Sequence, residues 1–388
     1  MADSDRIQMS YIEESEFGVE EADSPLQILR LTGESLKQDT TTELSKEIRS
    51  DRQVSDVKRT SIGASGDINT ELSFEAYDDL LAAALFSAGW SAEVAAIDAD
   101  ITISAASADN SFNDSANGFG DYVANQWIYV TGFATAANNG FFKIVSVVAG
   151  KIVVSGGTLI DESAGETVVV KIQMGPQIVN GTTRTSFNIE KQYTDVVNTF
   201  ALYLGMVINS MQLSVSAGQI ITGGFGFLGK QEESIAASLG SEYTAAPTNS
   251  VMSAVDDVMA ILEAQTAYDA NSFSLSLANN LRQKDIIGTL GAIDIKPGKV
   301  SISGTLQAYF ESSTAMDKYL DHTASSIAIP FQDSAGNGYV IELPYIKFSS
   351  GQRVAGGMNT DIIADLAFEA SMHPTELITI RIAKFAAA

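Results

Sequence analysis

The sequence predicts a mainly β protein with packed sheets and one or two short flanking helices, and three observations support this fold class. Apolar and polar residues alternate over many short stretches, which is the period of a half-buried strand. Asn-Gly pairs, which favour tight hairpin turns, occur among these stretches. The chain has 388 residues, of which 45% are hydrophobic, so it can fill more than one core. We therefore expect a β-sandwich or barrel accompanied by a second, smaller domain.

The first 24 residues are acidic and only weakly periodic. A segment of this composition buries too little apolar surface to order itself. We expect an N-terminal arm over residues 1–24. The sequence leaves two alternatives open for it: a loose tail, or an arm that orders on a neighbouring subunit.

The stretch from residue 29 to residue 85 organises the rest of the chain. Residues 29–36 alternate as a strand, and residues 66–73 alternate as a second strand. Between them, residues 38–58 form a polar arm in which acids, bases and hydroxyl residues interleave. A loop of this length without a sheet of its own is uncommon in a compact domain and is usually functional.

A short amphipathic helix is expected over residues 74–85. Its apolar positions follow helical spacing and are Tyr77, Leu80, Leu81, Ala84 and Leu85. We expect Ser73 to cap this helix, and Glu75, Asp78 and Asp79 to complement the positive end of its dipole.

This order of elements resembles the major tail tube proteins of long-tailed, non-contractile (siphovirus) bacteriophages. In that family a T-G-E-S-L-K strand, an S-x-E-I-x-S-D-R arm and a G-x-I-x-x-E-L-S-x-x-x-Y-D-x-L-L strand and helix recur together. Here the three motifs begin at Thr32, Ser45 and Gly66. A second block of similar text runs from Phe187 to Lys230. The resemblance implies the sandwich-like tail tube fold.

Residues 97–175 interrupt the resemblance and are rich in Ala, Ser, Asn and Gly. Short β-branched strands are expected there over residues 101–103, 127–130, 141–145, 151–154 and 168–172. We therefore expect an inserted small all-β domain over residues 97–175 that projects outward. The tail tube domain is expected over residues 25–96 and 176–388.

Most of the remaining chain reads as strands. They are expected over residues 187–193, 200–211, 213–216, 220–230, 272–277, 300–310, 326–331, 339–348, 362–371 and 377–385. A short helix is expected over residues 314–323. Residues 251–263 are also expected to be helical, because Val255, Val258, Met259 and Leu262 follow helical spacing.

Charge and composition exclude several function classes. The net charge of −25 lacks the positive excess that binding to DNA phosphates requires. An acidic surface serves solubility, and it also suits the wall of a conduit to which DNA does not adhere. The chain has no cysteine, which excludes disulfides and thiolate metal sites. The acidic start is unlike a signal peptide and no apolar run could span a bilayer, so we expect a soluble cytoplasmic product.

For each candidate catalytic or ligand site, a structural role explains the residues better than a chemical one. Residues 224–229 match G-x-G-x-x-G, but Phe225 and Phe227 alternate as a strand does. His322 and His373 have no nucleophile or metal partners in sequence. The acids near residues 109–114 lack the calcium-loop pattern, and Asp78-Asp79 point apart on a helix. We therefore expect no enzyme, no metal and no cofactor.

The arm is the one feature for which a purely structural role is a weak explanation. Its mixed charges suit contact with another copy of the chain, because opposite charges fix register in a head-to-tail stack. We expect it to form a long hairpin that bridges to the adjacent subunit or ring. The expected contact residues are Glu43, Ser45, Glu47, Arg49, Asp51, Arg52 and Lys58.

The resemblance implies a structural virion protein that self-assembles into stacked rings, usually of six subunits, and forms the tail tube. It further implies assembly in the host cytoplasm, contacts with tape-measure, tail tip and tail terminator proteins, and passage of genomic DNA through the lumen without specific binding or any membrane contact. A tail hub or baseplate ring protein of the same fold is one alternative. A cell-surface carbohydrate-binding protein, suggested by the β-rich insert, is another.

Overall fold

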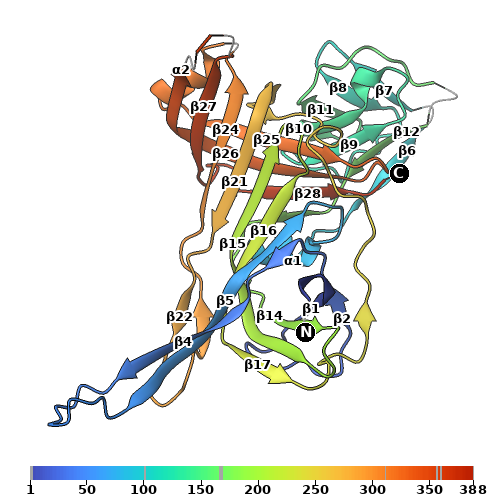
Figure 1. Ribbon diagram of the computed structural model, residues 1–388. Helices are drawn as coiled ribbons and strands as arrows, with labels where there is room; N and C mark the ends of the chain where they lie inside the picture. Colours follow the sequence, from blue (N-terminus) through green and yellow to red (C-terminus); the bar gives the residue numbers. More distant parts are fainter. Residues whose placement is uncertain are drawn as a thin grey trace.

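The computed structural model describes residues 3–99, 102–165, 169–310, 312–354, 357–358 and 361–387. Strands dominate these residues, and the α-helices among them are the short α1 (Asp78–Ala84) and α2 (Thr314–Leu320), so the mainly β prediction is confirmed. A long twisted sheet forms the middle of the molecule. A two-stranded arm leaves it at one end, and two lobes stand at the other end (Figure 1).

The long sheet is antiparallel and is built from strands distant in sequence. In spatial order its strands are β4 (Lys37–Leu44), β5 (Val57–Glu71), β16 (Thr222–Gly229), β15 (Phe200–Ser216), β21 (Ala270–Ala278), β24 (Ser301–Tyr309), β27 (Ile363–Ala370) and β26 (Gly338–Val354). The short β3 (Gly33–Glu34) lies beside β5. Because side chains alternate along each strand, one face of the sheet is apolar and buried and the other is polar.

A second layer packs against the apolar face and completes a sandwich. β26 belongs to both layers, because its first half pairs with β25 (Ser325–Gln332) and β28 (Arg381–Phe385) and its second half with β27. β28 also pairs with β13 (Gln177–Val179). β25 pairs with β19 (Leu262–Glu263), which in turn pairs with β20 (Thr266–Ala267). The core between the layers contains the buried rings of Phe273, Phe331, Phe348 and Phe368.

The N-terminal residues belong to a smaller sheet near the base of the arm (Figure 1). After a 3₁₀ turn, η1 (Ser4–Arg6), β1 (Ile7–Glu13) pairs with β14 (Phe187–Tyr193) and with β2 (Leu26–Ile28). β14 pairs with the first half of β15, and β17 (Gln231–Ile235) and β18 (Tyr243–Thr244) complete the sheet. Within residues 1–24, the seven residues of β1 fit neither alternative, because β1 is a strand of the chain's own sheet. Residues 200–211 and 213–216 are one strand, β15, rather than two.

Glu14 explains how an acidic segment becomes ordered. Its buried carboxylate accepts hydrogen bonds from the backbone N–H groups of Gly18 and Gly205 at 2.7 and 2.6 Å. The side chains of Ser186 and Asn188 donate two more at 2.6 and 2.5 Å. These four donors offset the cost of burying the charge, and they fasten the N-terminal segment to β14 and β15.

Residues 29–36 are not the continuous strand expected from their alternation. Only β3 within them is a strand, while the N–H of Leu29 bonds to β1 and those of Thr32 and Ser35 bond to β5. The segment crosses from the small sheet to the long one, so its pairing partner changes along its length. The regular strand begins later, at Lys37.

The first helix lies where the sequence places it, but its predicted cap is wrong. Tyr77, not Ser73, is the N-cap residue, and no side chain donates or accepts a capping hydrogen bond there. Glu75 precedes the helix, whereas Asp78 and Asp79 lie in its first turn. Each of these two aspartates accepts a hydrogen bond from a tyrosine hydroxyl, at 2.5 and 3.1 Å. They therefore fasten the helix to neighbouring strands as well as complementing its dipole.

The helix expected over residues 251–263 is wrong. The segment is extended and crosses the sandwich. The N–H of Met252 donates to the carbonyl of Leu72, and the Met252 carbonyl accepts from Ile221. The N–H of Met259 donates to the carbonyl of Pro330. Val255 and Met259 are 67% and 47% exposed while Leu262 is buried, so residues at helical spacing share no face. Tertiary pairing has overridden a weak local pattern. The helix expected over residues 314–323 is confirmed as α2.

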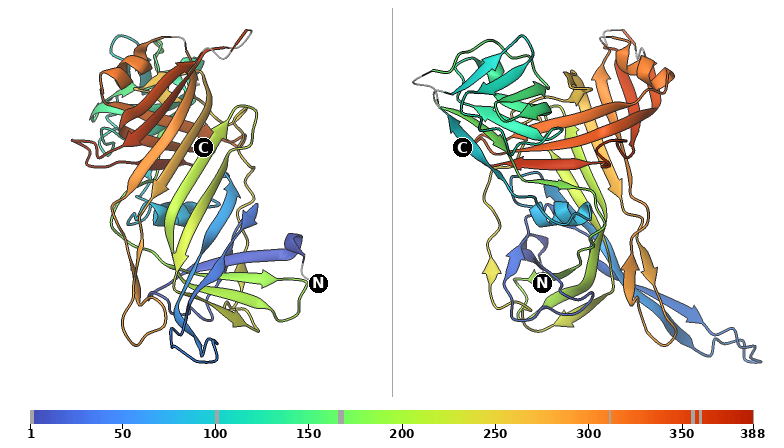
Figure 2. Two further views of the ribbon diagram at one scale, coloured as in Figure 1. Left: turned by 60° about the vertical axis from the view of Figure 1, so that its left-hand side comes forward. Right: turned by 180° about the vertical axis from the view of Figure 1, so that it is seen from behind.

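Residues 94–174 form a separate seven-stranded sheet, seen as one of the two lobes (Figure 2). In spatial order its strands are β6 (Val94–Ala99), β12 (Val170–Met174), β9 (Trp127–Thr131), β10 (Gly140–Val148), β11 (Lys151–Ser155), β8 (Ser111–Asp114) and β7 (Ile103–Ala106), with a 3₁₀ turn η2 (Ala136–Asn138) before β10. Its own core includes Phe112, Phe119 and Ile128. Residues 101 and 168, which belong to two expected strands, lie outside the described residues.

This lobe docks on β26 and β28 through an apolar contact and an ionic one. Trp127, Phe141 and Phe385 are buried together in the apolar contact. Beside them, the Lys143 ammonium lies 2.6 Å from one carboxylate oxygen of Glu342, whose side chain is completely buried. The lobe is thereby held against the sandwich by a packed and charged junction.

Candidate assembly surfaces

The arm is the most exposed part of the described chain. β4 and β5 continue beyond the long sheet as a two-stranded hairpin closed by residues 45–56 (Figure 1). From residue 46 to residue 60 every side chain is exposed. The predicted hairpin is confirmed. A two-stranded ribbon is marginally stable by itself, so this arm gains most from a contact outside its own chain.

All seven predicted contact residues lie on this hairpin: Glu43, Ser45, Glu47, Arg49, Asp51, Arg52 and Lys58. They do not form one charge cluster. Arg49 donates to Asp51 from two nitrogens at 3.0 and 2.8 Å, and this pair lowers the pKa of the Asp51 carboxyl. Glu43 and Lys58 stand opposite each other across the two strands. The charges therefore partly satisfy one another, and their contact with another copy stays a prediction.

The arm also exposes large apolar side chains, to which the sequence interpretation gave no role. Leu44, Val54 and Val57 are 59%, 56% and 55% exposed, and Ile48 at the tip is 99% exposed. Leu44 and Val57 are cross-strand neighbours and so lie on one face of the ribbon. A neighbouring pair of exposed apolar side chains on a projecting element is a candidate for a protein contact. Apolar burial, more than charge, is the feature this arm offers a partner.

The polar face of the long sheet, whose strands are drawn in Figure 2, is a second candidate surface. Its outward side chains are carboxylates, amides and hydroxyls, with glycine between them, on five adjacent strands. They are Asp67, Asn69 and Glu71 on β5, Thr222, Gly224 and Gly226 on β16, Ser210, Gln212 and Ser214 on β15, Ser272, Ser274 and Ser276 on β21, and Ser303, Thr305 and Gln307 on β24. None of these named positions carries a basic side chain, and Lys347 on β26 is a cation that shares this face, through its pairing with Glu369.

This face is hollowed where glycines replace side chains. One hollow of about 600 Å³ is lined by polar groups of β5, β15, β16 and β21, including Asn69, Gln212 and Ser276. A second, of about 200 Å³, lies beside Asp67 and Gly226. A Cβ at Gly226 would lie 2.8 Å from a carboxylate oxygen of Asp67, so glycine keeps the strands close without crowding this face.

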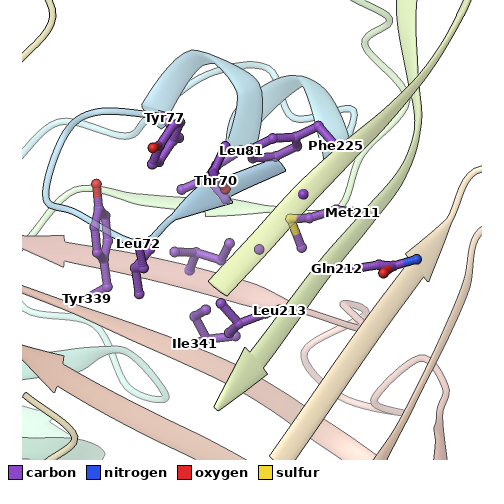
Figure 3. A pocket seen from close by; sticks show the side chains of 13 residues that line it. Thr70, Leu72, Tyr77, Leu81, Met211, Gln212, Leu213, Phe225, Tyr339 and Ile341 are labelled. Atoms are coloured by element: carbon purple, nitrogen blue, oxygen red, sulfur yellow. The ribbon is translucent and has the colours of Figure 1, made fainter. Parts of the chain in front are cut away.

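An enclosed pocket lies between α1 and the sandwich, lined by Tyr77, Leu81, Met211, Phe225 and Tyr339 among others (Figure 3). Its free space is about 30 Å³, roughly the share of one water molecule in the liquid. The lining is almost entirely apolar, and the Tyr339 hydroxyl donates to Asp78 instead. The pocket is a packing gap in the core and is too small for a substrate.

The motifs weighed in the sequence have structural roles. Residues 224–229 lie inside β16, where Phe225 and Phe227 face the core. The Nδ1 atom of His373 accepts backbone hydrogen bonds within its own turn, and His322 is exposed after α2. Asp109 pairs with Lys151. Over the described residues, no group of three or more His, Asp or Glu is arranged to hold a metal ion.

Comparisons with known proteins identify the family of the chain. No helix in the described part of the chain is long and apolar enough to cross a membrane. No curated protein sequence matches the chain. The model of the family described as phage tail tube protein matches residues 4–370, nearly the whole chain. That family is structural and not enzymatic. The chain therefore belongs to the phage tail tube protein family and is a structural component of a phage tail.

Proposed function

We propose that this protein forms rings, of six subunits as the resemblance implies, and that the rings stack head to tail into the tube of a long, non-contractile tail. The observation that supports this most directly is the arm. It carries exposed apolar and charged side chains away from the body of the subunit, where a neighbouring copy could meet them (Figure 1). Rings would stack around a tape-measure protein, between tail tip and terminator proteins, in the host cytoplasm.

The polar face of the long sheet is our candidate for the lumen wall. DNA passing along the named hydroxyls, amides and carboxylates of β5, β16, β15, β21 and β24 meets no cationic side chain among them to which its phosphates could adhere. The concave glycine-containing surface also fits the inside of a tube. The lobe of residues 94–174 is separated from the sandwich by its junction with β26 and β28. We propose that residues 97–175 are an inserted domain that projects outward from the tube domain.

Electron microscopy of the purified protein at rising concentration tests the proposed function. We expect hollow tubes of uniform width with a regular axial repeat. Single rings that never stack would instead favour a tail hub or baseplate ring protein of the same fold. A protein that stays monomeric with the tail tip complex added would contradict self-assembly into a tube.

Placing cations on the proposed lumen face should retard DNA passage. We expect virions carrying Gln212→Lys, Ser214→Lys and Ser276→Lys to eject DNA more slowly, with the delay relieved by salt. Each phosphate contact adds about −0.9 to the slope of log affinity against log salt. Asparagine at the same three positions is the matched control and should leave ejection unchanged. Equal ejection rates for the lysine and asparagine virions would show that this face does not line the lumen.

A further inference from the structure

A second projecting element lies beside the base of the arm, at the same end of the molecule (Figure 1). β22 (Arg282–Lys284) and β23 (Asp294–Lys296) form a short hairpin whose loop, residues 285–293, is rich in branched apolar residues. Ile287 is fully exposed, and Ile286, Leu290 and Ile293 are also exposed. The sequence interpretation gave this loop no role.

The loop is held rigidly at its base. Ala292 and Ile295 are buried, and the Asp294 carboxylate pairs with Arg184 and with Lys296. Burial alone would raise the pKa of Asp294, but the two cations outweigh it and lower the pKa to about 2. A fixed base limits the freedom of the loop and so lowers the entropic cost of docking it. Such an element suits a defined docking contact.

The opposite end of the subunit carries a hollow of matching chemistry. Next to α2, a hollow of about 510 Å³ is lined by Tyr268, Tyr309, Phe310 and Met316 among others. A neighbouring hollow of about 390 Å³ shares Tyr268, Asp269 and Tyr309 with it. The views in Figures 1 and 2 place α2 and the end of β24 far from the β22–β23 loop.

The charges of the two ends are complementary. Exposed cations flank the loop, namely Arg282, Lys284 and Lys296. Exposed Asp269 lines the hollow, and exposed Asp317 and Asp321 lie in and at the end of α2 beside it. The lining Lys318 is already paired with buried Glu263. In a head-to-tail stack each end of a subunit meets the opposite end of the next, so these two surfaces face each other.

We propose that the 285–293 loop of one subunit docks into the hollow at Tyr268 and Tyr309 of a second copy in the adjacent ring. This contact rests on the proposed stacking of rings and adds a second junction beside the arm. Ile287 enters the hollow against Tyr268, Tyr309 and Phe310, which supply the apolar part of a mixed lining, while Lys284 and Asp269 are on the rims that meet. The contact is heterologous, so it repeats at every ring and extends the tube without closing on itself.

Cysteine cross-linking tests the contact, since the native chain has no cysteine. Tubes of an Ile287→Cys/Tyr309→Cys variant, oxidised after assembly, should give a ladder of covalent polymers that continues beyond six subunits. Each single variant should give no ladder. Ile287→Cys with Ile160→Cys, a 52% exposed position in the 94–174 lobe, is the matched control and should also give none.

The outcomes separate this contact from the function on which it rests. Tubes without a ladder would overturn the docking contact while leaving ring stacking intact. A ladder that ends at one ring would place the contact between neighbours in the same ring and overturn the inter-ring assignment. Absence of tubes from the parent protein would overturn the proposed function and the contact together. As a second measure, Ile287→Asp should raise the concentration needed for tubes at least about tenfold, and Ile160→Asp should not.

Discussion

Shortening the arm should abolish tubes and leave a folded subunit. Thr42 and Arg59 are register partners across β4 and β5, so residues 43–58 can be replaced by Asn-Gly, the preferred two-residue hairpin turn. The change removes all seven predicted contact residues and the exposed Leu44, Ile48, Val54 and Val57. None of the removed segment contributes to the core of the sandwich, so folding should be unaffected. Tube yield in the electron microscope and the thermal unfolding midpoint measure the two effects.

A matched control tells apolar contact from charge. Ile48→Asp changes one tip residue that is 99% exposed, and we use it beside Asp51→Asn, which breaks only the internal pair with Arg49. If apolar burial drives the contact, Ile48→Asp should suppress tubes and Asp51→Asn should not. Wild-type tubes from the shortened protein would refute the arm as a contact between subunits. A shortened protein that fails to fold would show that the arm serves its own subunit.

Several strands could be predicted from sequence because their pattern is local. In β21, Phe273, Leu275 and Leu277 face the core and the serines between them face outward. The alternation of residue types therefore matches the alternation of buried and outward positions. The arm was predictable for the opposite reason, since residues 38–58 lack enough apolar side chains for a core. The polar face was not predictable. It depends on the lateral order of β5, β16, β15, β21 and β24, and that order is set by pairings between distant strands.

The errors share one physical cause, which is long-range pairing that overrides a weak local signal. β1 lies in a segment that is acidic overall, and it is ordered by pairing with β14 more than 150 residues away and by the donors around Glu14. Residues 251–263 contain apolar residues at helical spacing, yet Val258, Met259 and Leu262 run along β25 beside Phe331, Pro330 and Ala328. The 285–293 loop reads as a short apolar run, and only its place at the end of the molecule reveals its exposure.

Removing Glu342 should destabilise the junction between the 94–174 lobe and the sandwich more than any other single change discussed. Its two carboxylate oxygens lie 2.6 Å from Lys143 Nζ and 2.6 Å from Arg381 Nη1. Glu342→Ala leaves Lys143 and Arg381 to share the carboxylate of Glu376, with the Asn125 carbonyl as a further acceptor for Arg381. Breaking a buried ion pair by removing one partner costs about 3–5 kcal/mol. Urea unfolding followed by the fluorescence of Trp127, which is buried in the same junction, measures the loss.

The pH dependence of the same junction provides an independent check. Burial would raise the pKa of Glu376, but Lys143 and Arg381 outweigh burial and hold the pKa below its ordinary value of 4.5. A carboxyl whose folded pKa is depressed stabilises the protein above its unfolded pKa, and it loses that contribution as the pH falls through the folded pKa. Stability should therefore decline as the pH drops below about 4.5, and Glu376→Gln should flatten the decline. An unchanged pH profile in Glu376→Gln would show that other carboxyls govern acid unfolding. For Glu342→Ala itself, a loss of unfolding free energy well below about 3–5 kcal/mol would mean that the apolar contact of Trp127, Phe141 and Phe385 holds the lobe without the ionic one.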